Sequence, residues 1–233
     1  MKILALDSSG LVASVAVMED ETMLAEYTMN YKKTHSQTLL PMLDEMAKMI
    51  ELDLNTVDAI AVAGGPGSFT GLRIGSATAK GLGLALKKPL ISIPTVDGLA
   101  YNLCGTEKLV CPLMDARRNQ VYTGIYEFSG NELKVLEPQM AVDISVIAEK
   151  LNALEREVIF LGDGYPVYEK KLQELLSVPF LAAPAHMSRQ RAGALAALAM
   201  TYARKGMMES AAEHQPDYLR LSQAERERLE KNG

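Results

Sequence analysis

Three short segments near the start of the chain alternate apolar residues with polar or small ones, which is the pattern of half-buried strands. They read KILALDSSG, LVASVAVMED and ETMLAEYTMN, with turn residues at Ser9-Gly10 and Glu19-Asp20-Glu21. This pattern predicts three antiparallel strands joined by tight turns. The apolar residues of HSQTLLPMLDEMAKMIEL then recur at helical spacing, so we expect a helix there, with Thr34 or Ser36 as its N-cap.

The same order of elements occurs twice along the chain. After the first helix, VDAIAVAGG predicts a strand, residues 70–87 a second helix and LISIP another strand. The stretch LVCPLMDARRNQVYTGIYEFSGNELKVLEP then repeats the strand–turn–hairpin pattern, followed by a helix at about 143–154 and the strand EVIFLGDG. Asp7 and Asp115 each close the first strand of a unit. The sequence therefore predicts an α/β fold that consists of two similar lobes.

We place the boundary between the lobes near Pro94–Tyr101, which gives an N-terminal lobe over 1–97 and a C-terminal lobe over 98–233. The alanine-rich segment 188–206 predicts a long helix, which could complete the N-terminal lobe. The last dozen residues are highly charged, and we expect them to form a solvated or frayed helix.

The composition and charge of the chain bear on whether it binds nucleic acid or membranes by itself. The chain is 48% hydrophobic and 23% charged, with a net charge of −5 and a pI of about 5.4. This acidic balance argues against broad, unaided binding to a nucleic-acid backbone, which requires a basic surface. The start of the chain shows no signal-peptide pattern and no apolar run is long enough for a bilayer, so we expect a cytoplasmic protein without membrane contact.

The metal-ligating residue types are few and scattered. Cys104 and Cys111 do not have zinc-site spacing, and we expect reduced, partly buried thiols. His35, His186 and His214 are isolated from one another along the chain. We therefore predict no metal site.

The stretch AVAGGPGSFTGLRIGSATAKGLGLAL, residues 61–86, resembles a nucleotide-binding loop most closely. It lacks the Lys-Ser/Thr pair of a Walker A loop and does not fit G-x-G-x-x-G, because Thr70 stands at the third glycine position. A strand–GGPGSFTG–helix arrangement remains, with two interpretations. Its backbone N–H groups could form an anion-binding nest, or Gly64, Gly65 and Gly67 could supply positive φ angles for a tight turn.

Carboxylates at strand ends are the other candidates for chemistry. Asp7 with Ser8, Asp115 and Asp163 could face a cleft between the lobes and hold magnesium or act as a general base. They could equally cap turns. The first interpretation gives the alternative function, a nucleotide-binding ATPase or kinase whose ATP binding Asp7→Ala would abolish.

The helix after the glycine-rich loop has small residues at every fourth position: Gly71, Gly75, Ala79 and Gly83. Each glycine costs about 1 kcal/mol relative to alanine inside a helix, so close packing against another backbone must compensate. That neighbour could be the chain's own sheet or a second chain. Met42, Met46 and Met49 on the preceding helix suit either a core or a partner-binding surface.

Five motifs, in this order and spacing, resemble the bacterial TsaB (YeaZ) family over nearly the whole chain. They read LALDSS…ASVAV, THSQTLLPMLDEM, GGPGSFTGLRIGSATAKGLGLAL, DARRNQVYTGIY and PDYLR, and GPGSFTGLRIG is the most specific. The resemblance implies an actin/Hsp70-like (ASKHA) duplicated fold, in which each lobe has a mixed sheet flanked by helices. It also implies a role in making N6-threonylcarbamoyladenosine in tRNA, next to the anticodon, as a partner of the catalytic paralogue TsaD and of the ATPase TsaE.

One departure from the paralogue is informative. Where TsaD carries the metal-binding H-x-x-x-H, this chain reads IPTVDGLAY, with Asp97 and Tyr101 at the two histidine positions. A carboxylate and a phenol do not replace two imidazoles for that metal. We therefore expect no catalytic residue in this chain and no required cofactor, although weak ATP/ADP-Mg binding in the cleft remains compatible.

The resemblance further implies that the two helices form a four-helix bundle, with TsaD or, when the chain is alone, with a second copy in a homodimer. Carried over residue by residue, this interface would comprise His35, Leu39, Leu40, Met42, Leu43, Met46, Gly71, Arg73, Ile74, Gly75 and Thr78. On this basis Gly75→Leu would block the complex but leave the isolated protein folded. We expect tRNA to be held mainly by the partner.

Overall fold

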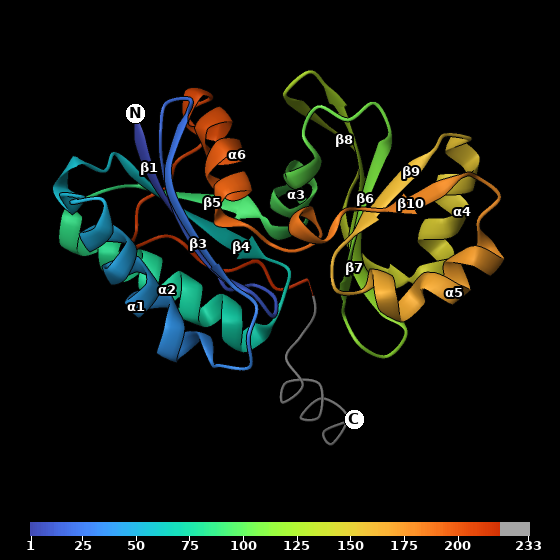
Figure 1. Ribbon diagram of the computed structural model, residues 1–233, viewed down its shortest axis with the longest axis horizontal. Helices are drawn as coiled ribbons and strands as arrows, with labels where there is room; N and C mark the ends of the chain where they lie inside the picture. The colour runs from blue at the N-terminus through green and yellow to red at the C-terminus, as the bar shows by residue number, and fades with distance from the viewer. Residues whose placement is uncertain (220–233) are drawn as a thin grey trace.

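The computed structural model, whose described part is residues 1–219, contains two five-stranded mixed sheets (Figure 1). The N-terminal sheet has the order β3-β2-β1-β4-β5 and the C-terminal sheet the matching order β8-β7-β6-β9-β10. Their strands are β1 (Lys2–Asp7), β2 (Ala13–Glu19), β3 (Thr22–Met29), β4 (Ala59–Gly65), β5 (Leu90–Pro94), β6 (Leu109–Asp115), β7 (Gln120–Ser129), β8 (Glu132–Asp143), β9 (Val158–Leu161) and β10 (Phe180–Ala182). This repetition confirms the predicted duplicated α/β fold.

In each sheet the first three strands form an antiparallel meander and the last two add in parallel. Crossover helices make the parallel additions possible, because parallel neighbours cannot be joined by a tight turn. As predicted, Asp7 ends β1 and Asp115 ends β6. The aspartates thus occupy corresponding positions at the carboxyl ends of the two first strands.

Helices cover both faces of each sheet. Helices α1 (His35–Met49) and α2 (Phe69–Leu86) cover the side of the N-terminal sheet that points away from the other lobe. Helices α4 (Ile144–Leu154) and α5 (Tyr165–Leu175) pack on the C-terminal sheet (Figure 1). Helix α3 (Thr95–Ala100) contacts β6 and β7, whereas α6 (Ala192–Arg204) returns from the C-terminal half to contact β1 and β2. Both inner helices lie between the two sheets.

The predicted helices at 70–87 and 143–154 agree with α2 and α4 to within one residue at each end. Thr34 is the residue before α1, as expected. Helices α3 and α5 and strand β10 were not predicted from the sequence. Helix α5 has a low apolar content and buries only Tyr168 and Leu172, so it lacks the apolar run that indicated the other helices.

The chain ends, within the described residues, in a segment that returns to the N-terminal lobe. We call residues 207–219 the C-terminal strap. Glu209 pairs with Leu90 at the edge of β5, and Ala211 packs into the core beneath α2. The last dozen residues, predicted as a solvated or frayed helix, lie outside the described part. Within residues 1–219 no helix has the length and apolar character needed to cross a membrane.

Candidate functional site

The outer helix pair α1 and α2 contains the residues predicted to form an interface (Figure 1). The two helices contact each other and share one core with the N-terminal sheet. The structure places four of the predicted interface residues in that core, each less than a tenth exposed: Leu39, Met42, Leu43 and Met46. These four side chains stabilise the lobe itself, so the methionine pattern of α1 is largely a core pattern.

The glycine row of α2 also faces inward. A Cβ atom at Gly71 would overlap the carbonyl oxygen of Ser8, and one at Gly75 would lie 2.7 Å from the Ser8 hydroxyl oxygen. The Ser8 hydroxyl in turn donates to the Gly71 carbonyl oxygen at 2.9 Å. The space that these two glycines leave is therefore filled by the chain's own first turn and not by a partner helix, which corrects that part of the interface prediction.

A second row of small residues faces outward on α2: Ala77, Gly81 and Ala85. No atom lies within 4 Å of the place where a Cβ at Gly81 would be. Leu84 beside this row is 60% exposed. On α1, Leu40 is 52% exposed and Met49 is 71% exposed. This outward row was not predicted, although it has the same four-residue spacing in the sequence.

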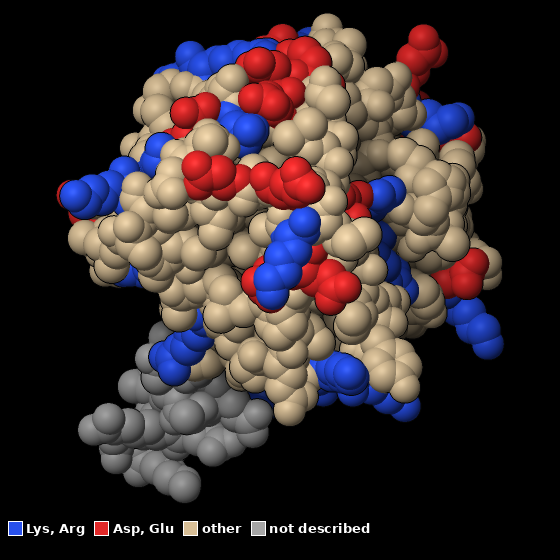
Figure 2. Space-filling view, turned by 60° about the vertical axis from the view of Figure 1, so that its left-hand side comes forward, with Lys and Arg blue, Asp and Glu red and all other residues tan. Residues whose placement is uncertain are grey.

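Three further predicted interface residues border this outward surface. Arg73 is exposed, with its guanidinium 4.0 Å from the centre of the Phe69 ring, and Ile74 and Thr78 are half-buried. His35 is also half-buried, with Nε2 2.8 Å from the Gly10 carbonyl oxygen. We define the outer face by eight residues chosen among the exposed and half-exposed positions of both helices: Leu40, Met49, Arg73, Ile74, Ala77, Thr78, Gly81 and Leu84. Elsewhere on the side of the molecule shown in Figure 2, acidic and basic side chains are interspersed.

Asp7 lies at the cleft end of β1 but its carboxylate is turned into the protein. Oδ1 accepts hydrogen bonds from the Ser9 backbone N–H at 2.9 Å and from the Ser9 hydroxyl at 2.6 Å. Burial raises the pKa of the Asp7 carboxyl, while the Ser9 hydrogen bonds and the charge of nearby His35 oppose the rise. This geometry is that of a turn-capping aspartate.

The glycine-rich loop between β4 and α2 is occupied from within the chain. Gly65 has a φ of +118°, and its missing side chain would overlap the carbonyl oxygen of Asp217 in the C-terminal strap. At Gly67 the corresponding neighbour is the carbonyl oxygen of Ser9, which also accepts from the Ser68 N–H at 2.7 Å. Of the two interpretations of the loop, these contacts favour the structural turn. The predicted positive φ angles were wrong for Gly64 and Gly67, where close neighbours and not the backbone conformation require glycine.

The strap crosses from this loop toward the other lobe. The Asp217 N–H donates to the Gly64 carbonyl oxygen at 2.6 Å, and its carboxylate accepts from Gln139 Nε2 on β8 at 3.3 Å. The Tyr218 ring lies 4.8 Å from the Phe69 ring at the start of α2. The strap thus covers the loop where a phosphate would otherwise approach the α2 N-terminus.

The two candidate carboxylates of the second lobe also accept hydrogen bonds from backbone N–H groups. Asp115 accepts from the Arg117 N–H at 2.8 Å, and Asp163 accepts from the Asp115 N–H at 3.2 Å. Burial raises the pKa of the Asp163 carboxyl. Among residues 1–219 no three His, Cys, Asp or Glu side chains are grouped closely enough to hold a metal ion.

Asp97 and Tyr101, at the positions of the paralogue's histidines, point to different neighbours. The buried Asp97 carboxylate accepts from the Tyr126 hydroxyl at 2.7 Å, and the Tyr202 hydroxyl is a second donor. The Tyr101 hydroxyl donates instead to the Asn131 carbonyl oxygen at 3.0 Å. The Asp97 network joins α3, β7 and α6, so it connects the lobes rather than forming a ligand site.

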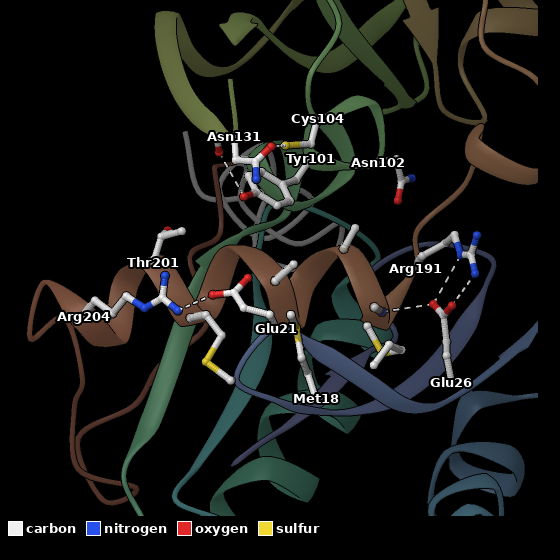
Figure 3. Close-up of a pocket in the computed structure, with 15 residues that line it drawn as sticks. Met18, Glu21, Glu26, Tyr101, Asn102, Cys104, Asn131, Arg191, Thr201 and Arg204 are labelled. Carbon is white, nitrogen blue, oxygen red and sulfur yellow. Dashed lines mark hydrogen bonds and ion pairs between the residues drawn. The ribbon is translucent and has the colours of Figure 1, made fainter. Parts of the chain in front are cut away.

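A groove of about 570 Å³ runs along α6 between the lobes (Figure 3). Ion pairs stand at its two ends, Arg191 with Glu26 and Arg204 with Glu21. Between them the floor is formed by small α6 residues such as Gly193 and Ala197. This groove could not be predicted from the sequence, because its lining comes from segments far apart in the chain.

The chain is similar in sequence and in structure to proteins of one family. A family model described as "TsaD: tRNA N6-adenosine threonylcarbamoyltransferase" matches residues 22–228. The chain is 33% identical over 233 residues to the "tRNA threonylcarbamoyladenosine biosynthesis protein TsaB" of Bacillus subtilis, covering 99% of each chain. Its structure is similar to "YeaZ from Pseudomonas aeruginosa", with a TM-score of 0.80 and 29% identity over 94% of this chain and 99% of that one. A dehydratase activator from Clostridium difficile shares the fold alone, with a TM-score of 0.50 and 11% identity over 88% of this chain and 97% of that one.

Proposed function

The chain belongs to the TsaB family, and we propose that within tRNA threonylcarbamoyladenosine biosynthesis it is a non-catalytic subunit that binds and activates TsaD in the cytoplasm. The observation that carries the proposal is the outer face of α1 and α2. Leu40 and Met49 of α1 and Leu84 of α2 are exposed, and the outward row of small residues on α2 would let a second pair of helices approach closely. The ASKHA fold that the chain shares with its paralogue gives the partner a corresponding helix pair.

The same face supports a homodimer when the partner is absent. A two-fold axis through α1 and α2 would place one copy of the face against another, since an isologous interface uses the same patch twice. Homodimer and heterodimer would then exclude each other. We further propose that TsaE joins the larger complex, and that TsaD supplies most of the tRNA contacts because this chain carries a net charge of −5.

The alternative function, an ATPase or kinase acting alone, gains no support from the cleft. The Asp7 carboxylate is used by Ser9, and the strap and the first turn occupy the glycine-rich loop. Both elements that would have to hold the phosphates are therefore already engaged within the chain.

Gly81→Leu tests the interface. The substitution places a large side chain on the open outer face without an internal clash, and is expected to abolish co-elution with TsaD in gel filtration with light scattering. Ala153→Leu, at an exposed position of α4 on the other lobe, is the matched control and should leave the complex intact.

Gly75→Leu no longer serves as the test, because its side chain would meet Ser8 within the chain and would perturb the fold. Full complex formation by folded Gly81→Leu would rule out the outer face as the binding site.

A further inference from the structure

The turn between β6 and β7 has an unusual backbone. Arg117, Arg118 and Asn119 have φ angles of +62°, +56° and +59°, a region that favours glycine and, to a lesser degree, asparagine. Hydrogen bonds keep the turn closed: the Arg117 N–H donates to Asp115, and the Gln120 N–H donates to the Arg117 carbonyl oxygen at 3.1 Å. Two of the three strained positions carry exposed arginines.

The corresponding turn of the first lobe is built differently. It follows β1, and its Ser8 hydroxyl and Ser9 and Gly10 carbonyl groups are bonded to Gly71, Ser68 and His35. In the second lobe neither guanidinium of the pair makes an ion pair or hydrogen bond with another described residue. Thus one turn is packed into its lobe, whereas the other carries two exposed arginines that no residue among 1–219 pairs.

Two further basic residues without an ion pair to any described residue lie toward the same edge of the molecule. Lys32 and Lys33 are exposed in the segment between β3 and α1, which His35 ties to the first turn. This segment and the β6–β7 turn both lie at the lower edge of Figure 1. Some basic residues elsewhere, such as Arg156 and Arg204, are instead paired with carboxylates.

We propose that Arg117 and Arg118, assisted by Lys32 and Lys33, form a contact surface for RNA phosphates. Guanidinium groups bind phosphate oxygens through paired, charge-assisted hydrogen bonds. The turn presents both arginines at the surface, and neither guanidinium is paired with another residue of the part that the structure describes. The surface is small and the rest of the chain is acidic, so it adds contacts to an RNA that the partner holds. This inference rests on the proposed function, because it needs the complex to bring RNA to this edge.

The test measures binding of a fluorescein-labelled RNA anticodon stem–loop by the complex of this chain with TsaD, using fluorescence anisotropy over a series of salt concentrations. Two lost phosphate contacts lower the slope of log K against log salt by about 1.4–1.8. Arg117→Ala/Arg118→Ala should show this loss of slope and roughly tenfold weaker binding at low salt. Arg117→Lys/Arg118→Lys should restore most of the slope.

Lys87→Ala/Lys88→Ala is the matched control. It removes the same charge at the far end of α2 and should leave the slope unchanged. An unchanged slope in the arginine variant, or an equal loss in both double variants, would overturn the inference. So would loss of complex assembly by the arginine variant, since the pair would then contact protein rather than RNA.

Gel filtration of each mixture separates the two proposals. If the unsubstituted chain does not co-elute with TsaD, the proposed function fails. If it co-elutes and the arginine variant binds RNA normally, only the RNA-contact inference fails.

Discussion

At the scale of single residues, Asp97 shows how a buried carboxyl connects the lobes and links stability to pH. Burial raises its pKa, and the hydroxyl hydrogen bonds of Tyr126 and Tyr202 only partly oppose that rise. The folded state therefore binds this proton more tightly than the unfolded state. As pH rises from the ordinary aspartate value of about 4 to the higher folded pKa, this group lowers the free energy of unfolding.

We expect Asp97→Asn to remove that loss, because the amide oxygen still accepts from the Tyr126 hydroxyl while carrying no charge. Urea unfolding across the pH range should give a shallower decline for Asp97→Asn than for the unsubstituted chain. Glu45→Gln, at an exposed position of α1, controls for general loss of negative charge. Identical pH profiles for all three proteins would contradict the argument.

The strained turn gives a second prediction at this scale. At Arg118, with φ of +56°, glycine avoids a conformational cost that alanine keeps. Arg118→Gly should therefore be more stable to thermal unfolding than Arg118→Ala, by about 1 kcal/mol. In helix α2 the order should reverse, with Arg73→Gly less stable than Arg73→Ala by about 1 kcal/mol. The same order at both positions would mean that the turn is not strained.

At the scale of elements, α2 shows what sequence spacing can and cannot predict. Its helical span and its need for close packing both followed from the sequence. The direction of that packing did not, because α2 has two rows of small residues, one through Gly71 and one through Gly81. Only the position of Ser8, more than sixty residues away in sequence, identifies the inward row.

The two rows should respond oppositely to one added methyl group. Gly81→Ala adds a Cβ in open space and should stabilise the protein by about 0.5–1 kcal/mol, because alanine favours the helix. Gly71→Ala forces a Cβ against the Ser8 backbone and should destabilise it by about 1–3 kcal/mol. Differential scanning calorimetry of both variants checks the assignment, which equal shifts of Tm would contradict.

At the scale of the whole molecule, the duplication was readable because each lobe repeats one order of local patterns, closed by Asp7 and Asp115. The contacts that join the two lobes could not be predicted from the sequence. The Asp97 network, the groove along α6 and the strap each join segments that are distant in the chain. Local periodicity carries no information about such contacts, so the sequence left open how much of the space between the lobes the chain itself fills.

The strap is where this long-range closure can be tested. Ala211 is buried against the core and would lie in contact with any side chain at Gly83, whereas its neighbour Ala212 is exposed. Ala211→Asp would bury an unpaired carboxylate. Because the free-energy cost of burying this charge is large, the strap should detach from the core. Hydrogen exchange should then increase in residues 207–218 and in the glycine-rich loop at 64–69 that the strap covers. Ala212→Asp introduces the same charge one residue later and should leave both regions protected. Equal protection in the two variants would mean that the glycine-rich loop keeps its conformation without the strap.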